Sequence, residues 1–197
     1  MKGHWKDNGL RYGRVTRILH WTTAFLLCWQ FSGLVIGRLF GRSALTDSLN
    51  STHGSLGAAV LILAMIRAAW GFYNLRNRPE HEQGLLGRAA IIGHITLYLL
   101  LLLIPALAIL RAVGSQWGLS LFGFALVSPG GVNIAWMMAP ANLLHSVFAW
   151  TLLAMIAGHI AMVLIHRTIW KDDVLNRMVG RPATTPVVKQ AAVDCTV

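Results

Sequence analysis

Three histidines interrupt one long apolar segment of the chain, LLHSVFAWTLLAMIAGHIAMVLIHR at residues 143–167. They are His145, His159 and His166, separated by fourteen and then seven residues. An α-helix has about 3.6 residues per turn and rises about 1.5 Å per residue, so all three lie near one stripe, with His145 and His159 about 21 Å apart along the axis. Ionisable side chains are costly inside a membrane and are usually functional there. This stripe is therefore a candidate for ligand chemistry.

The composition indicates an integral membrane protein. Of the 197 residues, 55% are hydrophobic and 12% are charged, whereas about a quarter are charged in a typical soluble domain. A span needs about 20 apolar residues. The sequence predicts an all-α, four-helix membrane bundle within one domain, 1–180, followed by a disordered cytoplasmic tail, 181–197. The predicted spans cover residues 18–39, 53–73, 91–113 and 141–165. The first span follows a charged stretch and is interpreted as a retained helix rather than a signal peptide.

The basic residues are unevenly distributed over this topology. Three lie at one side of the predicted membrane: Arg38, Arg42 and Arg111. Thirteen lie at the other: Lys2, Lys6, Arg11, Arg14, Arg17, Arg76, Arg78, Arg88, Arg167, Lys171, Arg177, Arg181 and Lys189. Basic residues favour the cytoplasmic side, so the pattern predicts a bacterial inner-membrane protein with both termini in the cytoplasm. Because topology explains most of the net charge of +10, nucleic-acid binding is not expected.

The histidines of the predicted helices fall at two depths. His53 and His145 are placed near the outer side, whereas His20, His159 and also His94 are placed near the inner side. Each one alone could be a core histidine bonded to a backbone carbonyl, but two at each of two depths favour cofactor ligation. Imidazole is a common axial ligand of haem iron, and bundle cores often hold such sites. The sequence therefore predicts two stacked haems, with His20 and His159 on the inner iron and His53 and His145 on the outer iron.

Two further residues are candidates for cofactor binding. His94 could replace His20 as a ligand, contact a haem propionate or assist proton uptake. Arg67 lies inside the second span, where it could pair with a propionate or make another buried polar contact. His166 is interpreted as a surface residue at the helix end.

Other features are less specific. Five glycines could admit either a flat macrocycle or a closely packed helix: Gly33, Gly37, Gly54, Gly57 and Gly158. All seven carboxylates lie outside the predicted spans, which argues against a carboxylate-bridged metal site. The chain has no C-x-x-C-H motif, so covalent haem attachment is not expected.

Four blocks spread along the chain carry a family resemblance. They are RYGRVTRILHW at 11–21, STHGSLG at 51–57, GHITLYLLLLLIP at 93–105, and the most specific block, at 143–178, which ends in KDDVLNRM. With these blocks the sequence resembles the bacterial cytochrome b561 family, which is related to the b-type cytochrome subunits of hydrogenases.

The resemblance implies a membrane bundle with two non-covalent b-type haems and the same histidine pairs. Some family members oxidise superoxide at the outer face and reduce ubiquinone, and others are linked to periplasmic electron carriers. The expected function is electron transfer from an outer donor, through both haems, to quinone, with the chain acting as an oxidoreductase. The alternative is a membrane anchor and electron-relay subunit of a hydrogenase or dehydrogenase. A third class is a structural or transport protein, which would contain no haem. The oligomeric state is left open.

Overall fold

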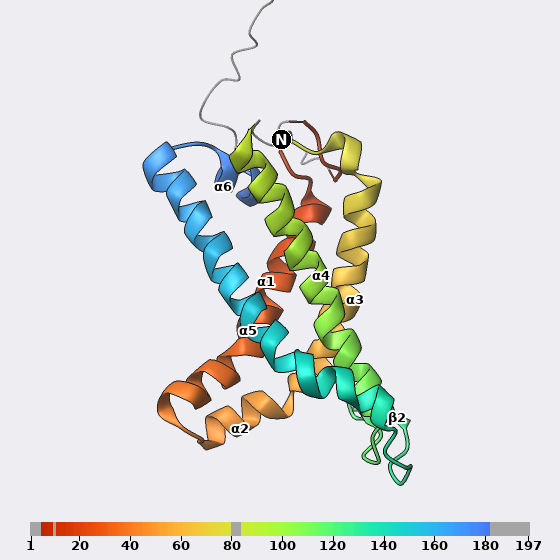
Figure 1. Cartoon of the computed structure of the whole chain (residues 1–197). Coiled ribbons are helices and arrows are strands. Elements are labelled where there is room, and N and C mark those ends of the chain that lie inside the picture. Colours follow the sequence, from red (N-terminus) through yellow and green to blue (C-terminus); the bar gives the residue numbers. More distant parts are fainter. Residues whose placement is uncertain (1–4, 10, 80–83, 182–197) are drawn as a thin grey trace, which may run out of the picture.

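Four long helices dominate the structure, a computed structural model that describes residues 5–9, 11–79 and 84–181 (Figure 1). They are α1 (Arg14–Phe40), α3 (His53–Tyr73), α4 (Leu85–Val113) and α5 (Ala135–Ile165). All four are long enough and apolar enough to cross a membrane, the last as part of a continuous helical stretch from Ala135 to Trp170. The predicted all-α, four-helix architecture is confirmed. Apart from Arg181, the predicted disordered tail lies outside the described residues.

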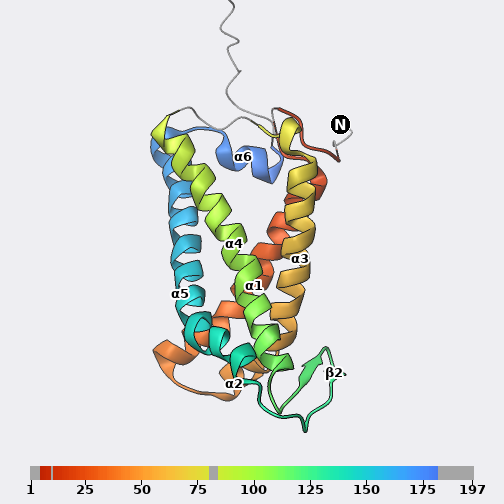
Figure 2. The ribbon, with the colours of Figure 1, turned by 45° about the vertical axis from the view of Figure 1, so that its right-hand side comes forward.

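The bundle has two distinct ends, best compared in Figures 1 and 2. The hairpin end carries α2 (Ala44–Ser51) and the strands β1 (Leu119–Leu121) and β2 (Phe124–Val127). The α6 end carries the start of α1, the short turn η1 (Leu75–Asn77), the π-helical turn η2 (His166–Trp170) and α6 (Val174–Val179).

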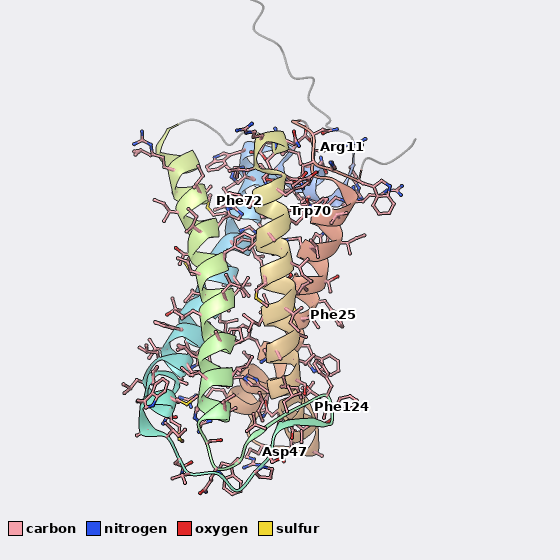
Figure 3. The ribbon with its side chains drawn as sticks, turned by 90° about the vertical axis from the view of Figure 1, so that its right-hand side faces the viewer. Arg11, Phe25, Asp47, Trp70, Phe72 and Phe124 are labelled. Carbon is pink, nitrogen blue, oxygen red and sulfur yellow. The ribbon has the colours of Figure 1, made fainter. Side chains whose placement is uncertain are left out.

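The helices pack in an open series rather than a closed ring. Extensive contacts join α1 to α3, α3 to α4 and α4 to α5, whereas α1 and α3 make no comparable contact with α5. Buried side chains from all four helices, among them Phe31, Ala64, Leu101 and Leu152, form the core. Many large apolar side chains instead remain exposed, including Phe72 (Figure 3). An exposed apolar surface of this extent is typical of a bundle surrounded by lipid.

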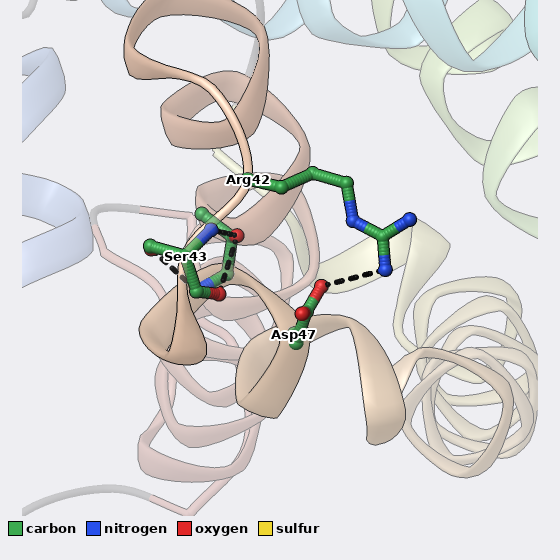
Figure 4. Close-up of polar contacts among 4 residues, drawn as sticks. Arg42, Ser43 and Asp47 are labelled. Carbon is green, nitrogen blue, oxygen red and sulfur yellow. Dashed lines mark hydrogen bonds and ion pairs between the residues drawn. The ribbon is translucent and has the colours of Figure 1, made fainter.

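A helix and a hairpin lie in the two connections at the hairpin end. Residues 44–51 form α2, whose start is fixed by reciprocal hydrogen bonds between Ser43 and Thr46 (Figure 4). This is the arrangement of a capping box. In the longer connection, β1 and β2 form an antiparallel hairpin, and the Phe122 amide donates to the Ser55 hydroxyl at 2.9 Å. The hairpin is thus tied to the first turn of α3.

A buried carboxylate organises the α6 end. Asp7 accepts hydrogen bonds from the Gly13 amide at 2.8 Å and the Thr16 hydroxyl at 2.6 Å. Its second oxygen lies 3.7 Å from Nε of Arg78. The Thr16 hydroxyl also accepts from the Trp70 indole at 2.9 Å. The N-terminal segment, α1 and the end of α3 are therefore held together by one polar cluster.

Tyr12 belongs to the same region. Burial raises its pKa, and the nearby positive charges of Arg78 and Arg177 oppose that rise. Because an ordinary phenol has a pKa of about 10, Tyr12 is neutral at neutral pH and contributes a hydrogen-bonding group rather than a charge.

Replacing Asp7 with alanine is expected to destabilise the protein by about 2–4 kcal/mol, because it leaves the Gly13 amide, the Thr16 hydroxyl and Arg78 without their shared acceptor. Asp47→Ala is a matched control, since it breaks the Arg42–Asp47 pair, whose side chains are 88% and 53% exposed (Figure 4). Exposed pairs contribute at most about 1 kcal/mol. Thermal unfolding of both variants in detergent gives the comparison, and equal losses would contradict the central role of Asp7.

Candidate functional site

One pair of histidines meets near the hairpin end. His53 is the first residue of α3, and His145 lies in the third turn of α5. Their ring centroids are 6.2 Å apart, with the ring planes inclined at 65°. Nδ1 of His145 is buried, and none of the described residues offers it a hydrogen-bond partner. Leaving a buried nitrogen without a partner lowers the stability of the fold by about 1–3 kcal/mol. We therefore expect this nitrogen to bind a group that is not part of the polypeptide.

A second pair meets near the α6 end. His20 lies in the second turn of α1 and His159 in the last two turns of α5. Their ring centroids are 6.4 Å apart, with the planes inclined at 60°. The structure thus brings together the same two pairs that the depth argument combined, and α5 contributes one histidine to each.

The ring separations fit a metal held between two imidazoles. An imidazole nitrogen lies about 2 Å from a metal that it binds, and the ring centre lies about 1 Å further away, so two opposite ligands have centres about 6 Å apart. Within residues 5–9, 11–79 and 84–181, no three His, Cys, Asp or Glu side chains gather to hold a metal ion. A pair of imidazoles suits haem iron, because the porphyrin supplies the other ligands.

His94 also approaches His159, but its setting differs. Their ring centroids are 5.3 Å apart and the planes are inclined at 82°, which is closer than the separation expected across a metal. His94 lies on α4, which packs extensively against α5, the helix of His159. Its Nδ1 is 2.7 Å from the carbonyl oxygen of Ala90, one turn earlier in α4. This geometry favours His20 over His94 as the partner of His159.

Arg67 contacts the pair near the α6 end directly. Its guanidinium donates to Nδ1 of His20 at 2.8 Å and lies 5.2 Å from the ring centre of Tyr98. A guanidinium only donates, so Nδ1 of His20 is an acceptor in this arrangement. A histidine that ligates through Nε2 carries its proton on Nδ1. Two donors would then face each other, and Arg67 would need another acceptor nearby.

Two residues of α1 that the sequence did not single out position His53. The Gln30 amide donates to the His53 carbonyl oxygen at 3.1 Å. The Trp29 indole donates to the hydroxyl of Thr52, the residue before His53, at 3.1 Å. Both lie in the apolar run of the first span, where only the polar character of Gln30 gave a sequence signal. These bonds fix the start of α3 against α1, and with it the backbone position from which the His53 side chain extends.

The glycines separate into two groups. A Cβ atom at Gly33 would lie 2.6 Å from the Asn50 side chain of α2, so Gly33 allows α1 and α2 to pack closely, whereas an added Cβ at Gly37 or Gly57 would make only ordinary contacts. At Gly54 and Gly158 no atom of the described residues would lie within 4 Å of an added Cβ. Those two glycines directly follow His53 and directly precede His159, so they leave room beside one histidine of each pair.

His166 has a different partner from the other helix histidines. Its Nδ1 lies against the carboxylate of Asp172, beyond the end of α5, and its ring meets Trp170 edge-on at 4.5 Å. It therefore stabilises the turn that follows α5, and no histidine among the described residues faces it. Its place at the helix end agrees with the prediction, but its side chain is only 17% exposed, so it is not the surface residue that was expected.

Comparison with known proteins assigns the chain to a family. A sequence model of the prokaryotic cytochrome b561 family matches residues 11–181, which include all four long helices and both histidine pairs. The chain belongs to the prokaryotic cytochrome b561 family. It is therefore a multi-pass bacterial membrane protein, a b-type cytochrome of electron transfer, and the family implies b-type haem as its cofactor.

Individual relatives match over most of their length. Cytochrome b561 homolog 2 of Escherichia coli (strain K12) is 28% identical over 176 residues, covering 88% of this chain and 94% of the relative. Cytochrome b561 homolog 1 of the same strain is 28% identical over 178 residues, covering 87% and 98%. A probable superoxide oxidase, CybB, of Yersinia pestis is 27% identical over 171 residues, covering 83% and 92%. The family prediction made from the sequence blocks is confirmed.

Proposed function

We propose that this cytochrome holds two b-type haems and carries electrons across the membrane from a donor at the hairpin end to quinone. His53 and His145 would ligate the iron near the hairpin end, and His20 and His159 the iron near the α6 end. The observation that carries the proposal is the matched separation of the two ring pairs, 6.2 and 6.4 Å. Haem so held supplies reversible one-electron transfer.

We also propose which side of the membrane each end faces. The α6 end carries most of the basic residues, which favour the cytoplasmic side, so we propose that this end and both termini lie in the cytoplasm. The hairpin end then faces the periplasm. A periplasmic donor would reach the His53–His145 pair first, and the His20–His159 pair would deliver electrons near the cytoplasmic surface.

Superoxide is the donor we propose. The support is the likeness to a probable superoxide oxidase, at 27% identity over most of both chains. Superoxide is a small anion, and the hairpin end offers it the exposed cationic side chains of Arg38, Arg42 and Arg111. The Asn142 side chain accepts from Arg111 at 2.7 Å, which directs that guanidinium towards α5. A quinone acceptor rests on the family resemblance.

Arg67 is proposed to pair with a haem propionate. In that role it would exchange its contact with Nδ1 of His20 for a carboxylate, which resolves the conflict between two donors. Its positive charge also favours the reduced haem. Arg67→Gln should therefore lower the midpoint potential of the haem near the α6 end by roughly tens of millivolts, as measured by redox titration.

The reduced-minus-oxidised absorption spectrum of the purified protein tests the proposal first. We expect a b-type signal with two haems per chain. One haem would mean that only one histidine pair ligates iron, and none in a folded sample would refute electron transfer through these histidines. Mixing the protein with a superoxide source should then reduce the haems, and added quinone should reoxidise them. Reduction only in the presence of a co-purified dehydrogenase would contradict superoxide as the donor.

A further inference from the structure

The chain turns sharply where α5 ends. After the π-helical turn His166–Trp170, Lys171 adopts a left-handed conformation with φ of 54°. The amide groups of Lys171 and Asp172 both donate to the His166 carbonyl oxygen, and the Asp172 carboxylate contacts the His166 ring. These bonds hold η2 and α6 in a fixed relation, with α6 folded across the end of the bundle (Figure 2).

A pocket of about 290 Å³ lies between this turn and α6. We call it the α6 pocket. Three cationic side chains line it, those of Arg167, Lys171 and Arg181, together with the carboxylates of Asp172 and Asp173. Its volume is close to the lower limit for small-molecule sites, about 300 Å³, which is sufficient for a phosphate group with a few attached atoms.

The two carboxylates are occupied by local partners. Asp172 contacts the His166 ring and accepts from the Val174 amide at 3.2 Å. Asp173 is buried and accepts from the Asn176 side chain at 2.8 Å. Among the described residues, no ion pair joins Asp172 to the three cations that line the pocket. With three cationic and two acidic side chains, the lining carries an excess of positive charge.

The position of the pocket selects among possible anions. It opens where the apolar helical stretch ends, at Trp170, and Ile169 and Trp170 beside it are 68% and 43% exposed. Tryptophan favours the membrane–water interface, so the pocket lies at the depth of lipid headgroups. An occupant with a phosphate in the pocket and hydrocarbon against Ile169 and Trp170 would satisfy both surfaces, whereas free phosphate would use only the first.

We propose that the α6 pocket binds the phosphate of an anionic phospholipid headgroup, with Arg167, Lys171 and Arg181 as its ligands. Basic pockets at the ends of membrane helices are suited to such headgroups. A bound lipid would fasten η2 and α6 to the last turns of α5, and so to the helix that carries His159. The proposal does not depend on which side of the membrane the α6 end faces.

Lipid titration of the haem-loaded protein in detergent tests this site. Phosphatidylglycerol should raise the apparent melting temperature more than phosphatidylcholine with the same acyl chains. The double variant Arg167→Gln/Lys171→Gln should lose that preference and bind phosphatidylglycerol about tenfold or more weakly, because two charge-assisted contacts are removed. Arg76→Gln is the matched control, since it removes an exposed cation of η1 at the same end, outside the pocket. It should respond as the wild type does.

Three results would overturn the proposal. One is an unchanged lipid preference in the double variant, and another is an equal loss in Arg76→Gln, which would indicate unspecific attraction to a basic surface. The third is equal stabilisation by soluble glycerol phosphate at the same concentration, which would assign the pocket to a free phosphate compound. If the double variant lacks its haem spectrum, Arg181→Gln provides the same test at the edge of the pocket.

Discussion

Replacing His145 with alanine is expected to remove one haem from the protein and to leave the other in place. His145 faces His53 at 6.2 Å near the hairpin end, and no other histidine ring is recorded in contact with this pair among the described residues. If His53 and His145 hold one haem as proposed, the loss of His145 would leave that haem with one histidine ligand, whereas the His20–His159 pair near the α6 end would be unchanged. Haem quantified against protein should fall from two to one per chain.

A methionine at the same position separates ligation from packing. His145→Met keeps an iron ligand, and exchanging histidine for methionine raises the potential of a haem. We therefore expect this variant to retain two haems, one with a higher midpoint potential. His166→Ala is the matched control. It removes a histidine from the same helical stripe, but this histidine contacts Asp172 rather than another histidine. Loss of both haems from His145→Ala without general unfolding would contradict the assigned pairing.

The sequence predicted the four-helix architecture because that information is local. Spans of about 20 apolar residues are visible without any knowledge of their neighbours, and His53–Tyr73 has the bounds that were predicted. The other three helices extend further than their apolar runs. For example, α1 begins at Arg14 and α4 at Leu85. Hydropathy detects the hydrocarbon-facing part of a helix, whereas backbone hydrogen bonding continues through the polar turns at its ends.

The histidine pairs could be grouped by depth, but contacts across the bundle could not be predicted. Depth placed His20, His94 and His159 at one level, so His20 was paired with His159 while His94 stayed open as an alternative ligand. The decision depends on the order in which the helices pack, which is a tertiary property. The contact of Arg67 with His20 and the hydrogen bond from Gln30 to the start of α3 join residues separated by more than twenty positions. No local pattern predicts either contact.

The connections between the spans depend on tertiary contacts for a related reason. Residues 40–52 have the mixed polarity of a connection, yet Ser43 and Thr46 cap a helix there. That helix packs closely against α1, where Gly33 leaves the space that Asn50 and Leu49 occupy. A glycine spacing in a span is compatible with a cofactor or with a helix, and only the position of the neighbouring chain distinguishes the two.

His20→Ala should remove the second haem, whereas His94→Ala should leave both haems bound. His20 and His159 have ring centroids 6.4 Å apart, close to the separation of about 6 Å expected for two imidazoles on one metal. They also lie on α1 and α5, which make few contacts with each other. By contrast, α4 and α5 pack extensively and leave no comparable space between them. His94 stands 5.3 Å from His159 across that closed contact, so a macrocycle between those two rings would have to separate packed helices.

Haem content and the spectrum of each variant measure this difference directly. A His94→Ala variant that retains two haems but reduces quinone more slowly would place His94 in proton uptake. A shift in the midpoint potential of the haem near the α6 end would instead place it beside a propionate. If His94→Ala loses a haem while His20→Ala retains two, His94 is the ligand, and Arg67 holds His20 for a structural reason. The two variants together therefore identify the histidine that would bind the same haem as His159. If it is His20, the haem lies between α1 and α5, and if it is His94, the haem lies between α4 and α5.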